Sequence, residues 1–291
     1  MVIRADRIHV FPDSARLGRQ LARAAGLGMA RVFLHRFPDG ESLVRVRAPV
    51  GRHAVLVRSL HDPNAKLVET ILAADALRRA GARRVTLVAP YLPYMRQDAV
   101  FAPGQPVSQR VLGDCLARAF DDVLTLEAHL HRTRRLADVL RGRGRSLPAA
   151  PALADWVRRV APDALIVGPD EESAPCVRAI ARAVGAAWVV GEKQRLGDHR
   201  VRIRFPALPA AARAVVVDDI ASSGGTLAMA AAALRRRGVR RVDALVVHPL
   251  FAPGAIGRIR RAGVRRILSC DTVPHPTNAI RSAPLFAAAL V

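Results

Sequence analysis

The chain has 291 residues, half of them hydrophobic, and 46 basic against 24 acidic side chains give it a formal net charge of +22. That length suits two domains of ordinary size, and no uninterrupted apolar run approaches the ~18 residues that a membrane-spanning helix needs. The N-terminus has no apolar signal core, and the three cysteines are too dispersed for a disulfide framework or a metal site. We therefore expect a soluble, cytoplasmic protein without membrane association.

The positive charge raises the possibility of nucleic-acid binding. However, only two of the 46 basic residues, Lys66 and Lys193, are lysines, and the arginines are spread along the predicted helices. We interpret the arginines as a solvated surface that binds polyanions weakly at low salt, without a specific nucleic-acid site. A lysine kept in such a chain can mark chemistry that arginine does not perform.

Apolar runs alternate with helical patterns in the first half of the chain, which is typical of an α/β arrangement with a parallel sheet. The predicted strands are residues 7–11, 32–37, 42–46, 54–59, 85–89 and 123–126, and the predicted helices are residues 15–25, 65–80 and 108–119. Gly81 ends the second of these helices. Lys66 lies in the first turn of that helix, and we interpret it as a surface residue.

Polar segments follow three of these strands. Residues 37–41, Phe-Pro-Asp-Gly-Glu, are typical of a hairpin turn. In the segment Pro90–Asp98, PYLPYMRQD, Arg96 can bind phosphate oxygens with its forked guanidinium and Gln97 can hydrogen-bond a base edge. His129 follows the strand at 123–126, where a lone histidine is usually a packing or surface residue.

The second half repeats this outline after a proline-containing junction at residues 147–151, as a duplicated fold would. Strands are predicted at residues 164–167, 187–190, 215–217 and 242–247. The polar segment Gly168–Ser173 stands between a strand and a helix.

The strongest chemical signal is the segment 214–238, AVVVDDIASSGGTLAMAAAALRRRG. A buried strand is followed by Asp218 and Asp219, then by the Ser/Gly/Thr loop Ser222–Thr226, and then by a helix that stops at Gly238. Such a loop at a helix N-terminus offers backbone N–H groups and hydroxyls to a phosphate. The Gly-Lys-Ser/Thr of a P-loop is missing, and an acid pair beside the loop suits the hydroxyls of a sugar phosphate. The alternative is an ordinary turn between a strand and a helix.

VVVDDIASSGGT resembles the ribose-5-phosphate-binding loop of the phosphoribosyltransferase fold. The loop alone leaves both a nucleobase phosphoribosyltransferase and a ribose-phosphate pyrophosphokinase open. The other motifs resemble, in the right order, segments of the ribose-phosphate pyrophosphokinase family: FPDGE, PYLPYMRQD, EAH, GPDEE, EKQR, HPLF and SCDTVPHP. The resemblance therefore covers nearly the whole chain.

This resemblance implies two similar phosphoribosyltransferase-type domains, each a mainly parallel sheet flanked by helices. The ATP-binding domain would be residues 1–147 and the ribose-5-phosphate domain residues 148–291. The implied enzyme is a transferase of nucleotide biosynthesis that moves the β,γ-diphosphate of Mg²⁺–ATP, bound between the domains, to the 1-hydroxyl of ribose 5-phosphate. The products are phosphoribosyl pyrophosphate (PRPP) and AMP. A homo-oligomer, a dimer or higher, is implied because FPDGE meets the adenine of a neighbouring subunit in the family.

The resemblance also implies roles for individual residues. ATP would be bound by Phe37, Asp39, Glu41, Arg96, Gln97 and Asp98. Ribose 5-phosphate would be bound by Asp218, Asp219, Ser222, Ser223, Gly224, Gly225 and Thr226. Mg²⁺ would be met by His129 and Asp170, and the charge on the transferred group would be stabilised by the catalytic pair Lys193 and Arg195.

Several positions depart from the family pattern, namely Ala99, Glu171, Glu172, Gln194 and Ser222. Ala99 stands where the family usually has a further basic residue, so one ATP contact is missing or comes from elsewhere. Because of these departures, the alternative that the protein is a non-catalytic regulatory relative of the family stays open. A phosphoribosyltransferase that uses PRPP remains a second alternative, but it would leave RQD and FPDGE without a role.

Overall fold

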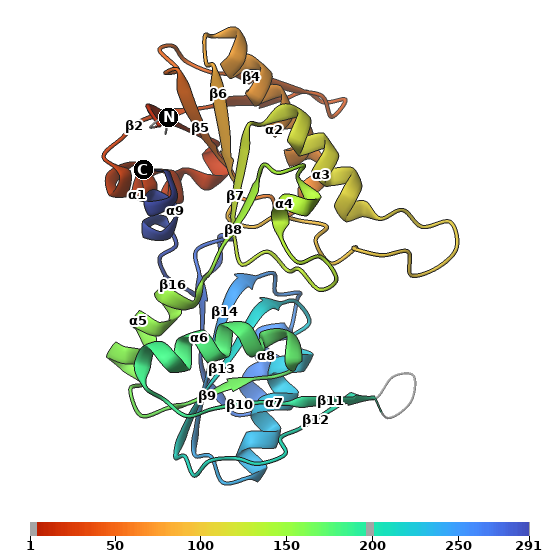
Figure 1. Cartoon of the computed structure of the whole chain (residues 1–291), viewed down its shortest axis with the longest axis vertical. Coiled ribbons are helices and arrows are strands. Elements are labelled where there is room, and N and C mark those ends of the chain that lie inside the picture. Colours follow the sequence, from red (N-terminus) through yellow and green to blue (C-terminus); the bar gives the residue numbers. More distant parts are fainter. Residues whose placement is uncertain (1–4, 196–200, 291) are drawn as a thin grey trace. The chain divides into compact units, whose positions relative to one another are not determined.

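The computed structural model describes residues 5–195 and 201–290, without the side chains of residues 194, 195, 201 and 202. By their contacts these residues form two compact units (Figure 1): unit 1 runs to Leu147 and resumes at Ser282, and unit 2 is Pro148–Arg281. The sequence placed everything after residue 147 in the second domain, whereas the last helix, α9 (Ala283–Leu290), packs on α1 (Ala15–Ala25) in unit 1. Phe286 and Leu290 are buried there.

Unit 1 is built on a six-stranded parallel sheet in the order β2-β1-β5-β6-β7-β8. Its strands are β1 (Arg7–Val10), β2 (Gly28–Arg31), β5 (His53–Val57), β6 (Arg84–Val88), β7 (Asp122–Leu126) and β8 (Gly144–Leu147). The central strand β5 is buried throughout, as its continuous apolar run predicts. A separate antiparallel hairpin consists of β3 (Phe33–Arg36) and β4 (Ser42–Arg45). The other helices are η1 (Pro12–Ser14), α2 (Pro63–Arg79), α3 (Ser108–Ala119) and α4 (Leu136–Val139).

Unit 2 repeats the design with a parallel sheet in the order β10-β9-β13-β14-β15-β16. Its strands are β9 (Leu165–Gly168), β10 (Trp188–Val190), β13 (Arg213–Ala221), β14 (Arg241–Pro249), β15 (Val264–Cys270) and β16 (Asn278–Ile280). β11 (Glu192–Arg195) and β12 (Val201–Arg204) form an antiparallel pair. The helices are α5 (Ala150–Val160), η2 (Glu171–Ser173), α6 (Ala174–Val184), α7 (Gly225–Arg236) and α8 (Ala255–Arg261). The predicted α/β class with two parallel sheets is confirmed.

The observed strands differ from the predicted ones most clearly at two places. The strand expected at residues 32–37 is β3, residues 33–36, which belongs to the hairpin, whereas β2, which precedes the buried Val32 and joins the main sheet, was not predicted. The strand expected at residues 215–217 continues to Ala221, because its pairing with β14 runs on as far as Ala221 opposite Pro249. Both acids of the pair therefore lie within a strand rather than after it.

A buried ion cluster lies where β5 leads into α2. Arg58, whose side chain is 1% exposed, pairs with Glu69 at 2.6 Å and with Asp13 at 3.2 Å, and its guanidinium lies over the ring of Phe11. Lys66 is buried here as well, with its Nζ 3.0 Å from Nε2 of His61. The expectation that Lys66 is a surface residue is therefore wrong, because the cluster covers the first turn of its helix.

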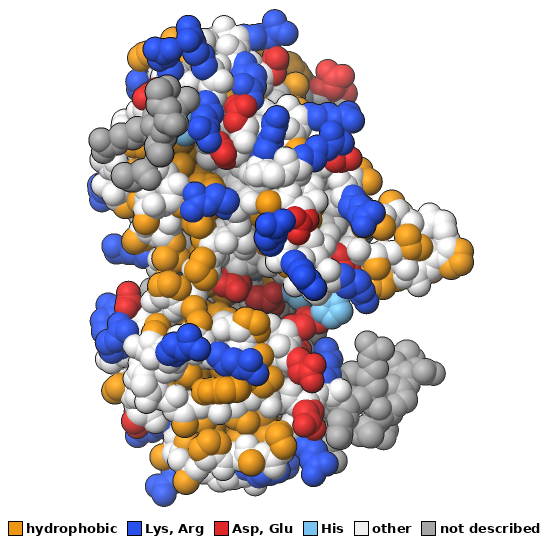
Figure 2. All heavy atoms as spheres, viewed as in Figure 1, with side chains coloured by type: hydrophobic (Ala, Val, Ile, Leu, Met, Phe, Trp, Pro, Cys, Tyr) orange, Lys and Arg blue, Asp and Glu red, His pale blue; other side chains and the backbone are white. Residues whose placement is uncertain are grey.

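Basic side chains are scattered over the visible face of each unit in Figure 2, with acidic and apolar side chains between them. Within residues 5–195 and 201–290, none of the helices combines the length and the apolar character that crossing a membrane requires.

Candidate active site

The carboxyl ends of β5, β6 and β7 lie at one edge of the unit 1 sheet, because these strands are parallel neighbours. The segment after each strand contains one non-glycine residue with a left-handed backbone: Asp62 with φ +50°, Tyr94 with φ +63° and Glu127 with φ +40°. Such conformations cost about 1–3 kcal/mol each and gather at functional sites. Ligands of parallel sheets also bind at this kind of edge. It is therefore the candidate site of unit 1.

The segment after β6 forms a tight turn that presents Arg96 and Gln97. The amide of Gln97 donates to the carbonyl of Tyr94 at 3.0 Å, and the Tyr94 hydroxyl donates to Oδ1 of Asn64 at the start of α2. Both Arg96 and Gln97 are exposed. Oε1 of Gln97 accepts a hydrogen bond from the Ser108 hydroxyl at 2.7 Å, so its amide nitrogen is the group that could read a base edge. The predicted phosphate-binding arginine is thus accessible at the sheet edge.

Asp98 is oriented differently from its two neighbours. Its side chain is 1% exposed, and its two oxygens accept hydrogen bonds from Arg132, one from the backbone N–H at 3.0 Å and one from Nη1 at 2.8 Å. Burial alone would raise the pKa of the Asp98 carboxyl, but these bonds outweigh it and lower the pKa. Asp98 therefore holds Arg132.

The predicted residues Phe37, Asp39 and Glu41 lie at the turn between β3 and β4. Phe37 donates its amide to the carbonyl of Glu41 at 2.8 Å, and Oδ1 of Asp39 accepts from the amide of Glu41 at 3.0 Å. The Phe37 side chain is 41% exposed. Among the described residues, no hydrogen bond, ion pair or ring contact joins this turn to Arg96–Asp98. The turn therefore stands apart from the β6 segment within one chain.

His129 lies two residues beyond the left-handed Glu127 and is half-buried. The amide of Glu127 donates to the carbonyl of Leu147 at 2.8 Å, and the amide of Ala128 donates to Oγ of Ser146 at 2.8 Å. These two bonds to the end of β8 fix the backbone that carries the histidine. His129 thus lies at the same edge of the sheet as Arg96.

In unit 2, the loop predicted to hold phosphate connects β13 to α7. Ser222 and Ser223 are exposed, and Gly225 and Thr226 begin α7. Gly224 has φ +73°, and a Cβ there would lie 2.9 Å from the side chain of Ile259, so only glycine fits without strain. The carbonyl of Ser222 accepts a hydrogen bond from Ala252 at 3.1 Å. The conformation of the loop thus depends on glycine and on a hydrogen bond from Ala252, and its two serines are exposed.

Acidic side chains gather at the same edge of the unit 2 sheet, where β9 and β13 are parallel neighbours. Burial raises the pKa of the Asp218 carboxyl well above its usual range, and the charges of Asp219 and Asp170 raise it further. Burial also raises the pKa of Asp170, with a second contribution from Glu172, while the charge of Lys193 opposes both. This concentration of carboxylates favours a cation or a ligand rich in hydroxyl groups.

Lys193 and Arg195 lie on β11, where Lys193 pairs with Ile203 of β12. Lys193 is exposed. The side chain of Arg195 lies outside the described part of the chain. The charge of Lys193 lowers the pKa of Asp170, so the two side chains lie in the same neighbourhood of unit 2.

The donor atoms present suit Mg²⁺ as an ion that arrives with a nucleotide. In the described residues, no group of three or more His, Cys, Asp or Glu side chains is arranged to hold a metal. Mg²⁺ usually binds through one or two carboxylates, several waters and the substrate's own phosphates, and it does not need a protein cage. Asp170, with Asp218 and Asp219 nearby, supplies such oxygens.

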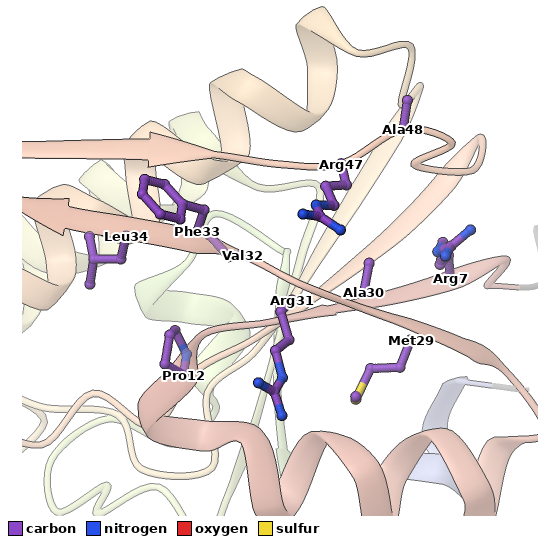
Figure 3. Close-up of a pocket in the computed structure, with 10 residues that line it drawn as sticks. All are labelled: Arg7, Pro12, Met29, Ala30, Arg31, Val32, Phe33, Leu34, Arg47 and Ala48. Atoms are coloured by element: carbon purple, nitrogen blue, oxygen red, sulfur yellow. The ribbon is translucent and has the colours of Figure 1, made fainter.

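A separate pocket of about 670 Å³ opens in unit 1 between β2, the hairpin and the start of η1 (Figure 3). It is lined by Arg7, Pro12, Met29, Ala30, Arg31, Val32, Phe33, Leu34, Arg47 and Ala48. None of these was predicted as a site residue, and we assign the pocket no part in the reaction.

Sequence reasoning missed three residues that shape the unit 1 site: Asn64, Tyr94 and Arg132. Tyr94 and Asn64 set the turn of the β6 segment, and Arg132 is the partner of Asp98. Tyr94 belongs to the recognised PYLPYMRQD run, but nothing in the sequence shows a positive φ at a tyrosine. Arg132 is one of 46 basic residues and carries no distinguishing pattern.

Comparison with known families matches residues 8–119 to the N-terminal domain of ribose phosphate pyrophosphokinase and residues 150–280 to the phosphoribosyl transferase domain. The ribose-phosphate pyrophosphokinase of Methanopyrus kandleri is 35% identical over 282 residues, which are 96% of each chain. Ribose-phosphate pyrophosphokinase 2 of Archaeoglobus fulgidus is 34% identical and covers 95% of this chain and 97% of its own.

A solved structure, the phosphoribosylpyrophosphate synthetase of Mycobacterium smegmatis, superimposes with a TM-score of 0.84 over 98% of this chain and 97% of its own, at 23% identity. At that identity the likeness concerns the fold, and it extends over both units. It confirms two phosphoribosyltransferase-type halves in one chain.

Proposed function

The chain belongs to the ribose-phosphate pyrophosphokinase family, and we propose that it transfers the β,γ-diphosphate of ATP to the 1-hydroxyl of ribose 5-phosphate, giving PRPP and AMP. The observation that carries this proposal is the near full-length identity of 34–35% to pyrophosphokinases. A phosphoribosyltransferase alone would not account for residues 8–119, which match the pyrophosphokinase N-terminal domain.

Unit 2 is proposed to bind ribose 5-phosphate. The loop Ser222–Thr226 offers the hydroxyls of two exposed serines and of the half-buried Thr226, and helix α7 adds the positive end of a helix dipole for the 5-phosphate. Asp218 and Asp219 are proposed to accept hydrogen bonds from the ribose hydroxyls. A neutral sugar ring beside these half-buried carboxylates adds no further negative charge to the place where the pKa of Asp218 is already raised.

Unit 1 is proposed to bind ATP at the edge that carries Arg96, Gln97 and His129. The exposed guanidinium of Arg96 can take two phosphate oxygens at once, and the amide nitrogen of Gln97 can donate to the adenine. His129 would meet the metal-bound phosphates. Asp98 is proposed to act through Arg132.

The reaction requires the 1-hydroxyl oxygen of ribose to attack the β-phosphorus while the bond from that phosphorus to the oxygen bridging it to the α-phosphate breaks. The hydroxyl proton is lost and AMP leaves. Lys193, exposed beside the carboxylate edge, is proposed to stabilise charge on the transferred group, together with Arg195. Such transfers depend mainly on positioning and on cations.

Mg²⁺ would be held by Asp170 together with the ATP phosphates and would neutralise part of their charge. His129 is the other predicted contact. It is less suited to direct ligation because Mg²⁺ prefers oxygen donors, so a contact through a bound water fits it better.

A homo-oligomer is proposed because the turn carrying Phe37, Asp39 and Glu41 has no partner in the β6 segment of its own chain. Its exposed phenyl ring and two exposed carboxylates are proposed to meet a nucleotide of a neighbouring copy.

The regulatory alternative differs in one measurable respect, because it forms no product. Incubation of the protein with Mg²⁺, ATP and ribose 5-phosphate should give AMP and PRPP in equal amounts. Binding of ribose 5-phosphate without either product would favour the regulatory alternative.

A further inference from the structure

The mechanism proposed so far names Arg132 only as the partner of Asp98 and gives it no contact with a ligand, yet the structure fixes it beside the β6 segment. Both oxygens of the buried Asp98 carboxylate are directed at it, one to its backbone N–H and one to its Nη1. A residue held through both its backbone and its side chain loses little further freedom when it binds a ligand.

The part of the Arg132 guanidinium that does not contact Asp98 is accessible to a ligand. The side chain of Arg132 is 52% exposed, whereas that of Asp98 is 1% exposed. Its guanidinium carbon lies 5.5 Å from the centre of the Phe101 ring, which restricts its movement further. A guanidinium has five N–H donors, so one carboxylate contact at Nη1 leaves donors for a second anion.

Arg132 and the β6 segment also belong to one hydrogen-bonded assembly through Gln109, which is 2% exposed. The side-chain nitrogen of Gln109 donates to the carbonyl of Met95 at 3.0 Å, and its backbone N–H donates to that of Gln97 at 3.1 Å. Its Oε1 accepts from the hydroxyl of Thr133, the residue after Arg132, at 2.9 Å. The positions of Arg132 and Arg96 are thus set by the same buried side chain.

We infer, building on the pyrophosphokinase function proposed above, that Arg132 is a second phosphate-binding arginine of the nucleotide site and that Asp98 is the residue that orients it. The residue directly after Asp98 is Ala99, which has no charge. Arg132, from the segment after β7, instead supplies a positive charge beside Asp98. The group that it binds is the polyphosphate of the nucleotide.

The test is the affinity of the full-length protein for a non-hydrolysable ATP analogue, measured by calorimetry with Mg²⁺ present. Arg132→Gln removes the charge and the fork, and it should weaken analogue binding at least tenfold while leaving the Kd for ribose 5-phosphate unchanged. The matched control is Arg134→Gln, which removes an exposed arginine two residues further on and should change neither constant by more than twofold.

Asp98→Asn should also weaken analogue binding, by less than Arg132→Gln, because the arginine stays but loses its fixed orientation. Arg132→Lys keeps the charge without the planar fork and should weaken binding about three- to tenfold. If Arg132→Gln does not fold, the affinity of Arg132→Lys for the analogue tests the role of Arg132 instead.

Analogue affinity that is unchanged in Arg132→Gln, or a loss shared by Arg134→Gln, would overturn the role of Arg132 while leaving the pyrophosphokinase function standing. Failure of the unaltered protein to bind the analogue would instead overturn that function and the role of Arg132 with it.

Discussion

Arg58 and Glu69 form an ion pair of 2.6 Å in which both side chains are 1% exposed. The same carboxylate also accepts hydrogen bonds from Arg36 at 2.7 Å and from Ser42 at 2.9 Å, which form the pair next to the turn of the β3–β4 hairpin. One buried glutamate therefore ties the end of β5, helix α2 and the hairpin together. Breaking such a pair from one side is costly, because the other charge stays buried.

Glu69→Gln should therefore lower the stability of unit 1 by about 3 kcal/mol, since it removes the buried counter-charge of Arg58 and leaves it with the partly exposed Asp13. Asp75→Asn is the matched control, because Asp75 lies in the same helix and pairs with Arg79 in solvent, with side chains 61% and 80% exposed. Surface pairs of that kind contribute about 0.5 kcal/mol. Urea unfolding of both variants measures the difference, and equal stability of the two would contradict the role of Glu69.

The pKa of Glu69 predicts how the stability of unit 1 depends on pH. Burial alone would raise the pKa of Glu69, but the hydrogen bonds from Arg36, Arg58 and Ser42 lower it from 4.5 to about 2. Because the pKa of Glu69 is lower in the folded state, its carboxylate contributes about 3 kcal/mol to the free energy of unfolding. This contribution is complete above pH 4.5 and is lost as the pH falls toward 2. The gap in unfolding free energy between the unaltered protein and Glu69→Gln should thus narrow below pH 4.5. A gap that stays constant from pH 6 to pH 3 would refute this.

Gly224→Ala should weaken ribose 5-phosphate binding at least tenfold, because its Cβ would meet Ile259 and push the phosphate loop out of place. Gly238→Ala is the control, because Gly238 has φ +88° at the far end of α7 and an added Cβ there meets no atom within 4 Å. Both variants carry the strain of a left-handed alanine, about 1 kcal/mol. Calorimetry with ribose 5-phosphate separates them, and the same affinity in both would mean that the loop does not bind the phosphate.

Lys193→Ala should lower kcat by two orders of magnitude or more and leave the Kd for ribose 5-phosphate unchanged, because the lysine is proposed to act on charge that develops during transfer. Arg204→Ala serves as the control, since this exposed arginine lies on the partner strand β12. Single-turnover kinetics isolate the chemical step. A variant of Lys193 with normal single-turnover rates would remove it from the catalytic machinery.

Much of the fold could be predicted, because buried parallel strands are continuous apolar runs and the helices between them have a clear period. The extent of β13 could not be predicted, since carboxylates seldom lie within a strand and only its pairing with β14 shows that they do. The assignment of α9 to unit 1 could not be predicted either, because that contact joins opposite ends of the chain.

The candidate residues of the site came from motifs, and motifs specify side chains along the chain rather than their partners in space. Lys66 shows this limit, because the first turn of a helix is usually exposed and only the fold brings His61 and Asp13 against it. Asp98 shows it again, because the motif includes the aspartate but not Arg132, 34 residues further on.

The most direct test of the central claim follows the diphosphate itself, using ATP labelled on its β-phosphorus together with ribose 5-phosphate and Mg²⁺. If the β-phosphorus is attacked as proposed, all of the consumed label appears in PRPP and the released nucleotide is unlabelled AMP. Label that remains in ADP, or that appears in free phosphate or diphosphate without PRPP, would contradict the account.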